Sequence, residues 1–261
     1  MERQTPSQSL KQKLRNDEIA LGLWVTLETP TVSEIAAQIG LDWVCIDTEH
    51  SGLDFQDIAN HLRALNGTRT AALVRIPGID QGLIQKVLGL GAHGILVPRV
   101  RTAEEVELAV RFAKYPPRGS RGMGVERSTA WGKGMRRVSE ANEETMVVPM
   151  IETGDSGRNI DAIMRVPGID AFFFGPADYS ASVGFPGEWE GPGVAEQLIE
   201  IENRIREQRY PSGIVVKSPE DRNLRIQQGF RIIGLGVDST ILVNALTDLV
   251  NLIGRSQGGA S

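Results

Sequence analysis

Trp43-Val44-Cys45-Ile46-Asp47-Thr48-Glu49-His50 is the stretch that decides the fold, because an apolar run passes directly into three ionisable side chains. A short apolar run of this kind is typical of a buried strand. Asp47, Glu49 and His50 crowd its C-terminal end, and burying such groups is unfavourable unless they are paired or bind a metal. The stretch therefore predicts a strand that leads into a site where chemistry is done.

Short apolar runs alternate with helical patterns along the rest of the chain. Eight runs are expected to be strands: Ala20–Thr26, Trp43–Asp47, Ala71–Arg75, Gly94–Pro98, Met146–Ile151, Ala171–Phe174, Gly213–Val216 and Ile232–Leu235. Apolar residues three and four positions apart predict helices between them, among them Thr31–Ile39, Leu83–Leu90, Ala103–Ala113 and Val194–Gln208. Eight strands alternating with helices over about 250 residues are typical of an α/β protein of the (β/α)8 TIM-barrel class. A doubly wound open sheet is the alternative, but no glycine-rich dinucleotide fingerprint follows the first strand.

Two segments depart from this alternation. Residues 115–144 contain Pro116-Pro117 and several glycines and arginines. This segment is too long for an ordinary connection and predicts a functional or interface loop. Residues 254–261 are polar and rich in glycine, so we expect a disordered tail at the end of a single domain spanning residues 1–261.

Composition excludes several classes of protein. The 261 residues are 41% apolar and 23% charged, which is ordinary for a soluble globular chain. The net charge is −5 and the basic residues are scattered, which argues against a nucleic-acid surface. The single cysteine, Cys45, rules out an internal disulfide and is expected in the core. No apolar stretch is long enough for a membrane span, and the N-terminal residues lead into a polar helix, so the expected location is the cytoplasm.

Two carboxylates are candidates for a metal site. Glu152 ends the fifth expected strand and Asp178 follows the sixth. In a barrel these strands are neighbours, and two carboxylates that converge either repel or share a cation. An oxygen-only pair with open positions suits Mg²⁺ or Mn²⁺. The alternative is that each carboxylate caps the helix that follows it.

One of the three histidines is a candidate base. His50 lies three residues after Asp47 at the same strand end, and a carboxylate next to an imidazole fixes its tautomer and raises its basicity. His61 is expected on the surface of a helix. His93 precedes a strand at the opposite end of the barrel and is expected to be structural. Arg75, at the end of an apolar strand, is placed to hold an anion or polarise a carbonyl.

A turn beside the expected metal site can bind a carboxylate. Gly175-Pro176-Ala177-Asp178 exposes successive backbone N–H groups, from Ala177 and Asp178, at the start of the next segment. A divalent metal next to such a turn can chelate a 2-oxo acid and stabilise its enolate. Enolate chemistry on a 2-oxo acid means aldol cleavage or addition, proton exchange, or decarboxylation.

Five motifs, in order along nearly the whole chain, resemble the HpcH/HpaI aldolase/citrate lyase family. They are Ile46-Asp47-Thr48-Glu49-His50, Val74-Arg75, Tyr115-Pro116-Pro117-Arg118-Gly119-Ser120-Arg121-Gly122, Met150-Ile151-Glu152-Thr153 and Gly175-Pro176-Ala177-Asp178-Tyr179-Ser180. The most similar branch is the class II pyruvate aldolases, metal-dependent enzymes that act on 4-hydroxy-2-oxo acids or 2-dehydro-3-deoxy-sugar acids. Each motif is weak alone, but five in order are strong evidence.

The resemblance implies an activity and a set of roles. The activity is reversible retro-aldol cleavage of a 4-hydroxy-2-oxo acid to pyruvate, or hydroxypyruvate, and an aldehyde, through an enolate bound to a divalent metal. The resemblance implies that Glu152 and Asp178 are ligands of Mg²⁺, Mn²⁺ or Co²⁺. It implies that His50 is the general base, supported by Asp47, and that Arg75 stabilises the enolate oxygen. The pyruvate carboxylate would be surrounded by Gly175, Pro176, Ala177 and Asp178. The resemblance also implies an N-terminal helix and a C-terminal helix exchanged between protomers of a homohexamer, a trimer of dimers.

Two positions depart from the family pattern. Met150 stands where better-known aldolases of the family have a glutamine, and methionine cannot hydrogen-bond a substrate in the same way. Gly89 stands where they have an aspartate that reaches a neighbouring protomer's histidine. Three alternatives therefore stay open: a citrate-lyase-like or malyl-CoA-lyase-like enzyme acting on a CoA thioester, a macrophomate synthase-like decarboxylation of oxaloacetate with carbon–carbon bond formation, and a barrel that binds a 2-oxo acid without turnover.

Overall fold

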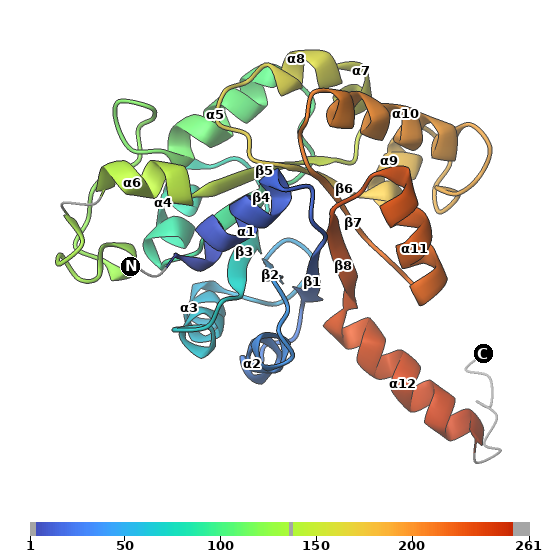
Figure 1. Cartoon of the computed structure of the whole chain (residues 1–261), viewed down its shortest axis with the longest axis horizontal. Helices are drawn as coiled ribbons and strands as arrows, with labels where there is room; N and C mark the ends of the chain where they lie inside the picture. Colours follow the sequence, from blue (N-terminus) through green and yellow to red (C-terminus); the bar gives the residue numbers. More distant parts are fainter. Residues whose placement is uncertain (1–3, 136–137, 253–261) are drawn as a thin grey trace.

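Eight parallel strands close into a barrel in chain order, as the sequence predicts (Figure 1). The computed structural model describes residues 4–135 and 138–252. The strands are β1 (Ala20–Val25), β2 (Trp43–Asp47), β3 (Ala71–Arg75), β4 (Gly94–Val97), β5 (Met146–Ile151), β6 (Phe172–Phe174), β7 (Ser212–Val215) and β8 (Ile232–Val237). They differ from the expected strands by at most two residues at an end. The barrel is closed by β1, which pairs with both β2 and β8.

Helices surround the barrel and follow most of the strands. They are α1 (Pro6–Arg15), α2 (Thr31–Gln38), α3 (Phe55–Ala64), α4 (Gln81–Gly89), α5 (Ala103–Ala113), α6 (Val138–Glu144), α7 (Gly154–Arg158), α8 (Ile160–Met164), α9 (Pro176–Ser182), α10 (Val194–Glu207), α11 (Pro219–Gln228) and α12 (Asp238–Leu252), with a 3-10 turn, η1 (Arg127–Thr129). Side-chain caps fix several starts, such as Asp54 before α3 and Ser218 before α11.

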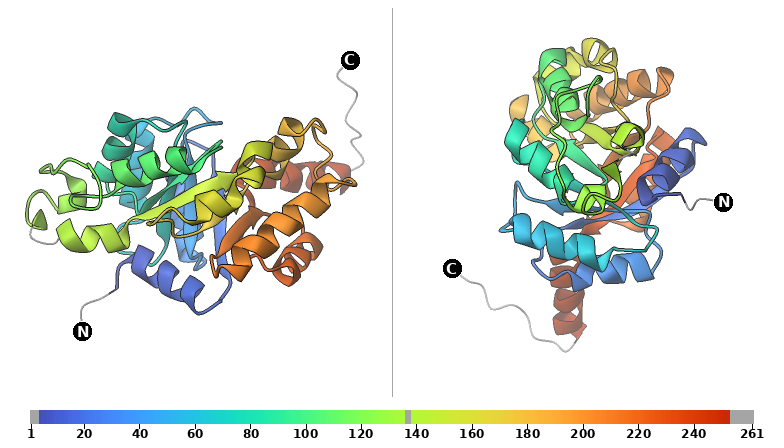
Figure 2. Two further views of the ribbon diagram at one scale, coloured as in Figure 1. Left: turned by 90° about the horizontal axis from the view of Figure 1, so that it is seen from above. Right: turned by 90° about the vertical axis from the view of Figure 1, so that its left-hand side faces the viewer.

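The N-terminal helix α1 closes one end of the barrel (Figure 2). Its Leu10 and Leu14 pack with residues at the starts of several strands, including Trp43 and Met146. The Lys11 ammonium lies 2.7 Å from the Asp170 carboxylate, which precedes β6. This end of the barrel is therefore plugged, and the open mouth is at the C-terminal ends of the strands, where candidate residues are expected.

The core has two apolar layers, one inside the barrel and one between the barrel and its helices. Cys45 belongs to the inner layer, where burial raises the pKa of its thiol, so the expected core position is confirmed. Met150 also lies in the inner layer and is 2% exposed. At this position the chain places an apolar side chain inside the barrel, two residues before Glu152.

Two histidines away from the mouth are structural. His93 accepts a hydrogen bond at Nδ1 from the Ala72 N–H (2.9 Å), and burial, aided by Arg127, lowers its pKa to about 4. Its expected structural role is confirmed. The expectation that His61 lies on the surface is wrong: it is fully buried, and its Nδ1 lies 2.8 Å from the Ser33 hydroxyl. His61 falls on the core face of α3 because that face recurs every three to four residues.

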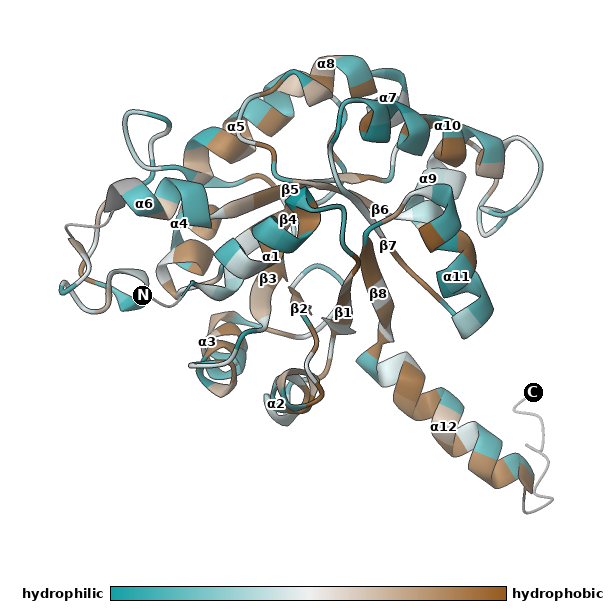
Figure 3. Ribbon diagram, viewed as in Figure 1, coloured by the Kyte–Doolittle hydropathy of each residue, from teal (hydrophilic) through white to brown (hydrophobic). Residues whose placement is uncertain are grey.

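The last helix, α12, extends away from the barrel (Figures 1 and 3). Its apolar residues are mostly exposed: Ile241, Leu242, Val243, Leu246, Leu249, Val250 and Leu252. Asp238 anchors its first turn by accepting hydrogen bonds from the N–H groups of Thr26 (2.9 Å) and Leu27 (3.0 Å). Within the described ranges, no helix is long and apolar enough to cross a membrane. The expected tail, residues 254–261, lies outside the described residues.

The long segment after α5 folds back on the barrel as η1 and α6. Asn142 ties its two ends together, accepting from the Tyr115 N–H (2.7 Å) and donating to the Tyr115 carbonyl (3.0 Å). Between these ends the loop exposes three apolar side chains, Met123, Val125 and Trp131.

Candidate active site

Asp47 and Arg75 form a buried pair at the mouth of the barrel. They are paired in register at the ends of β2 and β3. Arg75 donates from Nε to Asp47 Oδ1 (2.9 Å) and from Nη2 to Oδ2 (2.5 Å), and the Trp24 indole also donates to Oδ2 (3.1 Å). Burial alone disfavours the charged carboxylate, but the hydrogen bonds and charge of Arg75 outweigh it and lower the pKa of Asp47. The forked contact fixes the direction of the guanidinium.

The carboxylate that lies beside the His50 ring is not the expected one. Asp47 Oδ1 accepts from the main-chain N–H groups of Glu49 (3.0 Å) and His50 (3.3 Å), so Asp47 shapes the turn that carries the histidine. The carboxylate beside the imidazole is that of Glu49, whose Oε2 lies 3.9 Å from His50 Nε2. The expected support of the His50 ring by Asp47 is therefore corrected: the Asp47 oxygens already bind Arg75, Trp24 and the turn.

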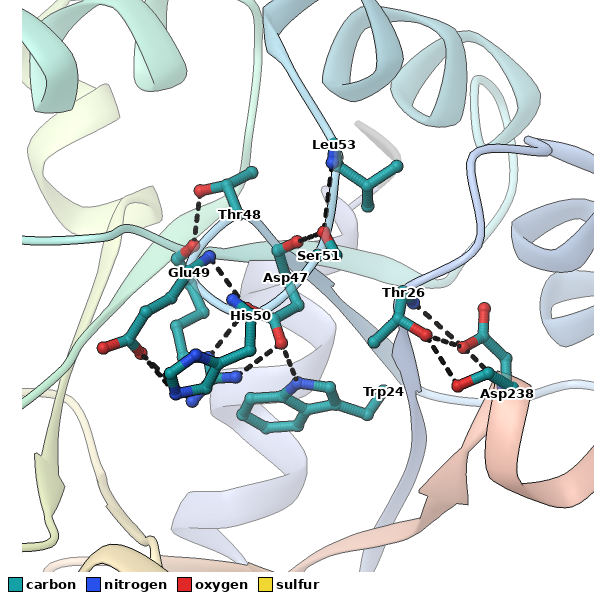
Figure 4. A network of polar contacts seen from close by, with 11 residues as sticks. Trp24, Thr26, Asp47, Thr48, Glu49, His50, Ser51, Leu53 and Asp238 are labelled. Carbon is teal, nitrogen blue, oxygen red and sulfur yellow. Dashed lines mark hydrogen bonds and ion pairs between the residues drawn. The ribbon is translucent and has the colours of Figure 1, made fainter. Parts of the chain in front are cut away.

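Glu49 lies between His50, whose ring is beside its carboxylate in Figure 4, and Arg75. Its Oε2 forms an ion pair with Arg75 Nη1 (3.1 Å), and its side chain is 11% exposed, whereas that of His50 is 58% exposed. Burial raises the pKa of Glu49 above its ordinary value, and the positive charge of Arg75 opposes that rise. The sequence predicts that Glu49 lies at the strand end but assigns it no role in the chemistry. Spacing alone does not tell whether Asp47 or Glu49 turns toward the His50 ring.

Glu152 is buried at the end of β5. Its Oε1 accepts a hydrogen bond of 2.5 Å from the Arg99 N–H, and Arg99 has a left-handed φ of 53°, uncommon for a residue with a side chain. Burial, together with the nearby carboxylates of Glu49 and Asp178, raises the pKa of Glu152 to about 7. Thr153, and not Glu152, caps the helix that follows, so the capping alternative for Glu152 is wrong.

The turn after β6 brings Asp178 toward Glu152. A Cβ atom at Gly175 would lie 2.6 Å from Glu152 Oε2 and 2.9 Å from Glu152 Cβ, so only glycine permits this approach. Pro176 starts α9, Gly175 holds its cap position, and Asp178 lies exposed in the first turn. Asp178 is thus not the cap of α9, and the first-turn N–H groups of Ala177 and Asp178 have no partners within the helix.

The donor set fits a divalent cation. Glu152, Asp178 and Glu49 influence one another electrostatically, and Arg75 is the cationic side chain that offsets them at Glu152. Oxygen donors with open positions are the ligands that Mg²⁺ and Mn²⁺ prefer. Over the described residues, no group of three or more histidine, cysteine or acidic side chains is arranged to hold a metal. Glu152 and Asp178 are the two carboxylates that could hold an ion, with the remaining positions open to water or substrate.

The Gly89 departure has a structural counterpart. A Cβ atom at position 89 would lie 2.2 Å from Oε2 of Glu126, in the loop before η1. An aspartate could not occupy position 89 unless Glu126 moved away. The chain thus places a carboxylate from the long loop beside the glycine, a contact that no local sequence signal predicts.

Comparison with known proteins extends over the same part of the chain as the barrel. The family model described as HpcH/HpaI aldolase/citrate lyase matches residues 20–245. A 4-hydroxy-2-oxovalerate aldolase of Novosphingobium aromaticivorans is 39% identical, with 90% of each chain covered. A hydroxypyruvate/pyruvate aldolase of Pseudomonas aeruginosa is 34% identical, covering 98% of this chain and 95% of that protein.

The crystal structure of an HpcH/HpaI aldolase/citrate lyase family protein from Burkholderia cenocepacia is also similar. It superposes with a TM-score of 0.89 at 30% identity, covering 95% of this chain and 99% of that one. The match of sequence and the match of fold agree, and both extend over most of the chain. The chain belongs to the HpcH/HpaI aldolase/citrate lyase family.

Proposed function

We propose that the chain is a class II aldolase, a carbon–carbon lyase that reversibly cleaves a 4-hydroxy-2-oxo acid to pyruvate, or hydroxypyruvate, and an aldehyde. The observation that carries the proposal is the Arg75 guanidinium, locked by Asp47 at the barrel mouth and electrostatically coupled to Glu152. The named activities of the relatives support the same reaction class. Exchange of the pyruvate methyl protons in D2O, with and without divalent ions, tests it.

Glu152 and Asp178 would hold Mg²⁺, Mn²⁺ or Co²⁺ beside the substrate. When bound, the ion supplies Lewis-acid polarisation of the 2-oxo group. The raised pKa of Glu152 supports this assignment, because the positive charge of Arg75 only partly offsets its burial beside other carboxylates. The ion would supply further positive charge.

The turn after β6 would bind the carboxylate end of the substrate. The N–H groups of Ala177 and Asp178 lie in the first turn of α9, where backbone donors and the helix dipole favour an anion. Gly175 and Pro176 set the path of this turn against Glu152. The oxo group of a bound 2-oxo acid would then lie toward the centre of the mouth.

Arg75 and His50 would act on the reacting atoms. The forked contact with Asp47 holds Arg75 so that it can stabilise negative charge on the enolate oxygen as that charge develops. His50 is the general base, and its half-exposed ring can reach the 4-hydroxyl of a substrate. Asp47 contributes through Arg75 and the turn, and not by touching the substrate.

The active form would be a homohexamer, a trimer of dimers, in which each copy contributes one barrel domain and exchanges α12 with a neighbour. The apolar face of α12 extends away from its own barrel (Figure 3). Exposed apolar side chains on α2, directly after it and on α11 (Ile35, Ile39 and Leu224) would be covered by α12 of a second copy. Covering these side chains removes apolar surface from water, which favours association.

Charged substitutions on α12 are expected to dissociate the assembly. Leu246→Glu with Leu249→Glu places two charges on the apolar face and should leave a smaller species at micromolar concentration. Asn244→Glu, on the same helix, adds a charge at a polar position and is the control. Sedimentation velocity measures the size of each variant. An unchanged sedimentation coefficient for the double variant would exclude α12 from the interface.

A further inference from the structure

Glu49 carries a buried oxygen that is not used as a hydrogen-bond acceptor. Among the described residues, its Oε2 accepts no hydrogen bond although it is buried. It is nevertheless drawn into the site, 3.1 Å from Arg75 Nη1 in an ion pair that lacks hydrogen-bond geometry, and 3.9 Å from His50 Nε2. A buried acceptor without a donor is unfavourable unless a donor reaches it during function.

The neighbouring carboxylate of Asp47 has no free hydrogen-bond acceptor position. Its two oxygens accept five hydrogen bonds, two from Arg75 and one each from the Trp24 indole and the N–H groups of Glu49 and His50. An ionised carboxylate offers about four lone-pair positions. Asp47 therefore cannot also orient the imidazole, whereas Glu49 can.

We propose that Glu49 is the positioning residue of His50: Glu49 Oε2 accepts the Nε2–H of the imidazole and leaves Nδ1 as the nitrogen that receives the substrate proton. The inference rests on the proposed function of this site. Figure 4 shows the Glu49 carboxylate and the His50 ring side by side, so a small rotation of the exposed ring closes the gap. The hydrogen bond of one ring nitrogen decides which tautomer is present.

The proton and electron pairs balance in the cleavage direction. Nδ1 of His50 takes the proton of the 4-hydroxyl, and the freed electron pair forms the aldehyde carbonyl as the C3–C4 bond breaks. The electrons of that bond move into the pyruvate enolate, whose charge faces Arg75. The Glu49 carboxylate stabilises the imidazolium, which then returns the proton to C3 to give pyruvate.

The charged groups around Glu49 leave its carboxylate able to pair with a protonated His50 ring. Arg75, on β3, is the nearest cation, but Asp47, on β2, already holds it through two hydrogen bonds. Asp178, on α9, is the other acidic group that influences Glu49 electrostatically, and Glu49 in turn influences Glu152, after β5. His50 is thus the remaining cationic partner near Glu49 when its ring is protonated.

Glu49→Gln removes the negative charge with little change of shape. We expect a fall in kcat of about tenfold with little change in KM, because a positioned base contributes a factor of this order or more. Glu49→Asp keeps the charge and should lie closer to the wild type in kcat.

Nitrogen-15 NMR of the histidine rings measures the tautomer of His50 and does not require turnover. In the wild type the His50 ring should be protonated at Nε2, and in Glu49→Gln the Nδ1–H tautomer should gain population. His50→Asn assigns the signals, since the chain has three histidines. Glu34→Gln, an exposed position on α2, is the control for loss of one negative charge.

An unchanged tautomer in Glu49→Gln would overturn the inference, even with a lower kcat. A tautomer change in a chain that proves to have no aldolase activity would support the Glu49–His50 contact and contradict only the proposed function. The two failures are thus distinguishable.

Discussion

Replacing Arg75 by lysine is expected to lower kcat by about 100-fold, as for loss of one donor to a developing oxyanion. Lysine keeps the positive charge but cannot make the two parallel contacts that join Arg75 to Asp47. It also loses the packing of the guanidinium over the Trp24 ring, at 5.0 Å from the ring centroid. The charge of a lysine would therefore be poorly aimed at the enolate oxygen. Steady-state kinetics of aldol cleavage measures the loss.

Arg101→Lys is the matched control for this substitution. Arg101 is 61% exposed in its side chain and pairs with Glu105, four residues further along the chain, a contact of little energetic value. Its replacement should leave kcat and the unfolding temperature unchanged. If the Arg75→Lys variant kept a kcat within a few-fold of the wild type, the forked contact would not be what aims the catalytic charge.

Glu152→Gln is expected to abolish divalent-ion binding and to reduce cleavage by at least about 100-fold, because a neutral amide replaces one of two ligands. The amide has nearly the same shape, so the mouth of the barrel should keep its form. Calorimetric titration with Mn²⁺ measures the binding. Glu107→Gln, at an exposed position on α5, is the control.

The same substitution should stabilise the chain when divalent ions are removed. The pKa of Glu152 rises from 4.5 to about 7 in the folded state. The folded state then holds this proton more tightly than the unfolded chain. The group therefore has no effect below about pH 4.5, destabilises the fold increasingly as the pH rises to about 7, and remains a constant penalty above it. Glutamine removes this penalty, on the order of 1–3 kcal/mol at pH 8.

Thermal unfolding in chelator at pH 5 and pH 8 measures this effect. At pH 8 Glu152→Gln should unfold several degrees above the wild type, and at pH 5 the two should be close. Added Mn²⁺ should raise the unfolding temperature of the wild type alone. A variant that still binds Mn²⁺, or that unfolds below the wild type at pH 8, would contradict the role given to Glu152.

The barrel was predictable because each strand is marked locally. Ala71–Val74 and Met146–Ile151 are apolar throughout, as strands buried on both faces must be, and the structure has strands at Ala71–Arg75 and Met146–Ile151. Residues that follow such runs must lie at the barrel mouth, so Asp47, Arg75 and Glu152 could be placed from sequence. The predicted family is confirmed by the matching family model.

Side-chain partners were less predictable, because they depend on directions that spacing does not give. Both Asp47 and Glu49 lie near His50 in sequence, and the pairing of Asp47 with Arg75 arises only when β2 and β3 align. The position of His61 was predicted wrongly because the sequence of a helix does not show whether a polar side chain has a buried hydrogen-bond partner. For His61 that partner is the Ser33 hydroxyl. The contact between Glu126 and Gly89 joins two segments that are far apart in the sequence and likewise follows from the fold alone.

Deuterium exchange into pyruvate is the decisive measurement for the proposed aldolase activity, since it reports enolate formation without an aldehyde. The protein is incubated with pyruvate in D2O, and the methyl proton signal is followed by NMR. With Mg²⁺, Mn²⁺ or Co²⁺ the signal should disappear much faster than without protein, and both chelation and Glu152→Gln should abolish this acceleration. Exchange no faster than the protein-free rate with any of these ions would contradict the account.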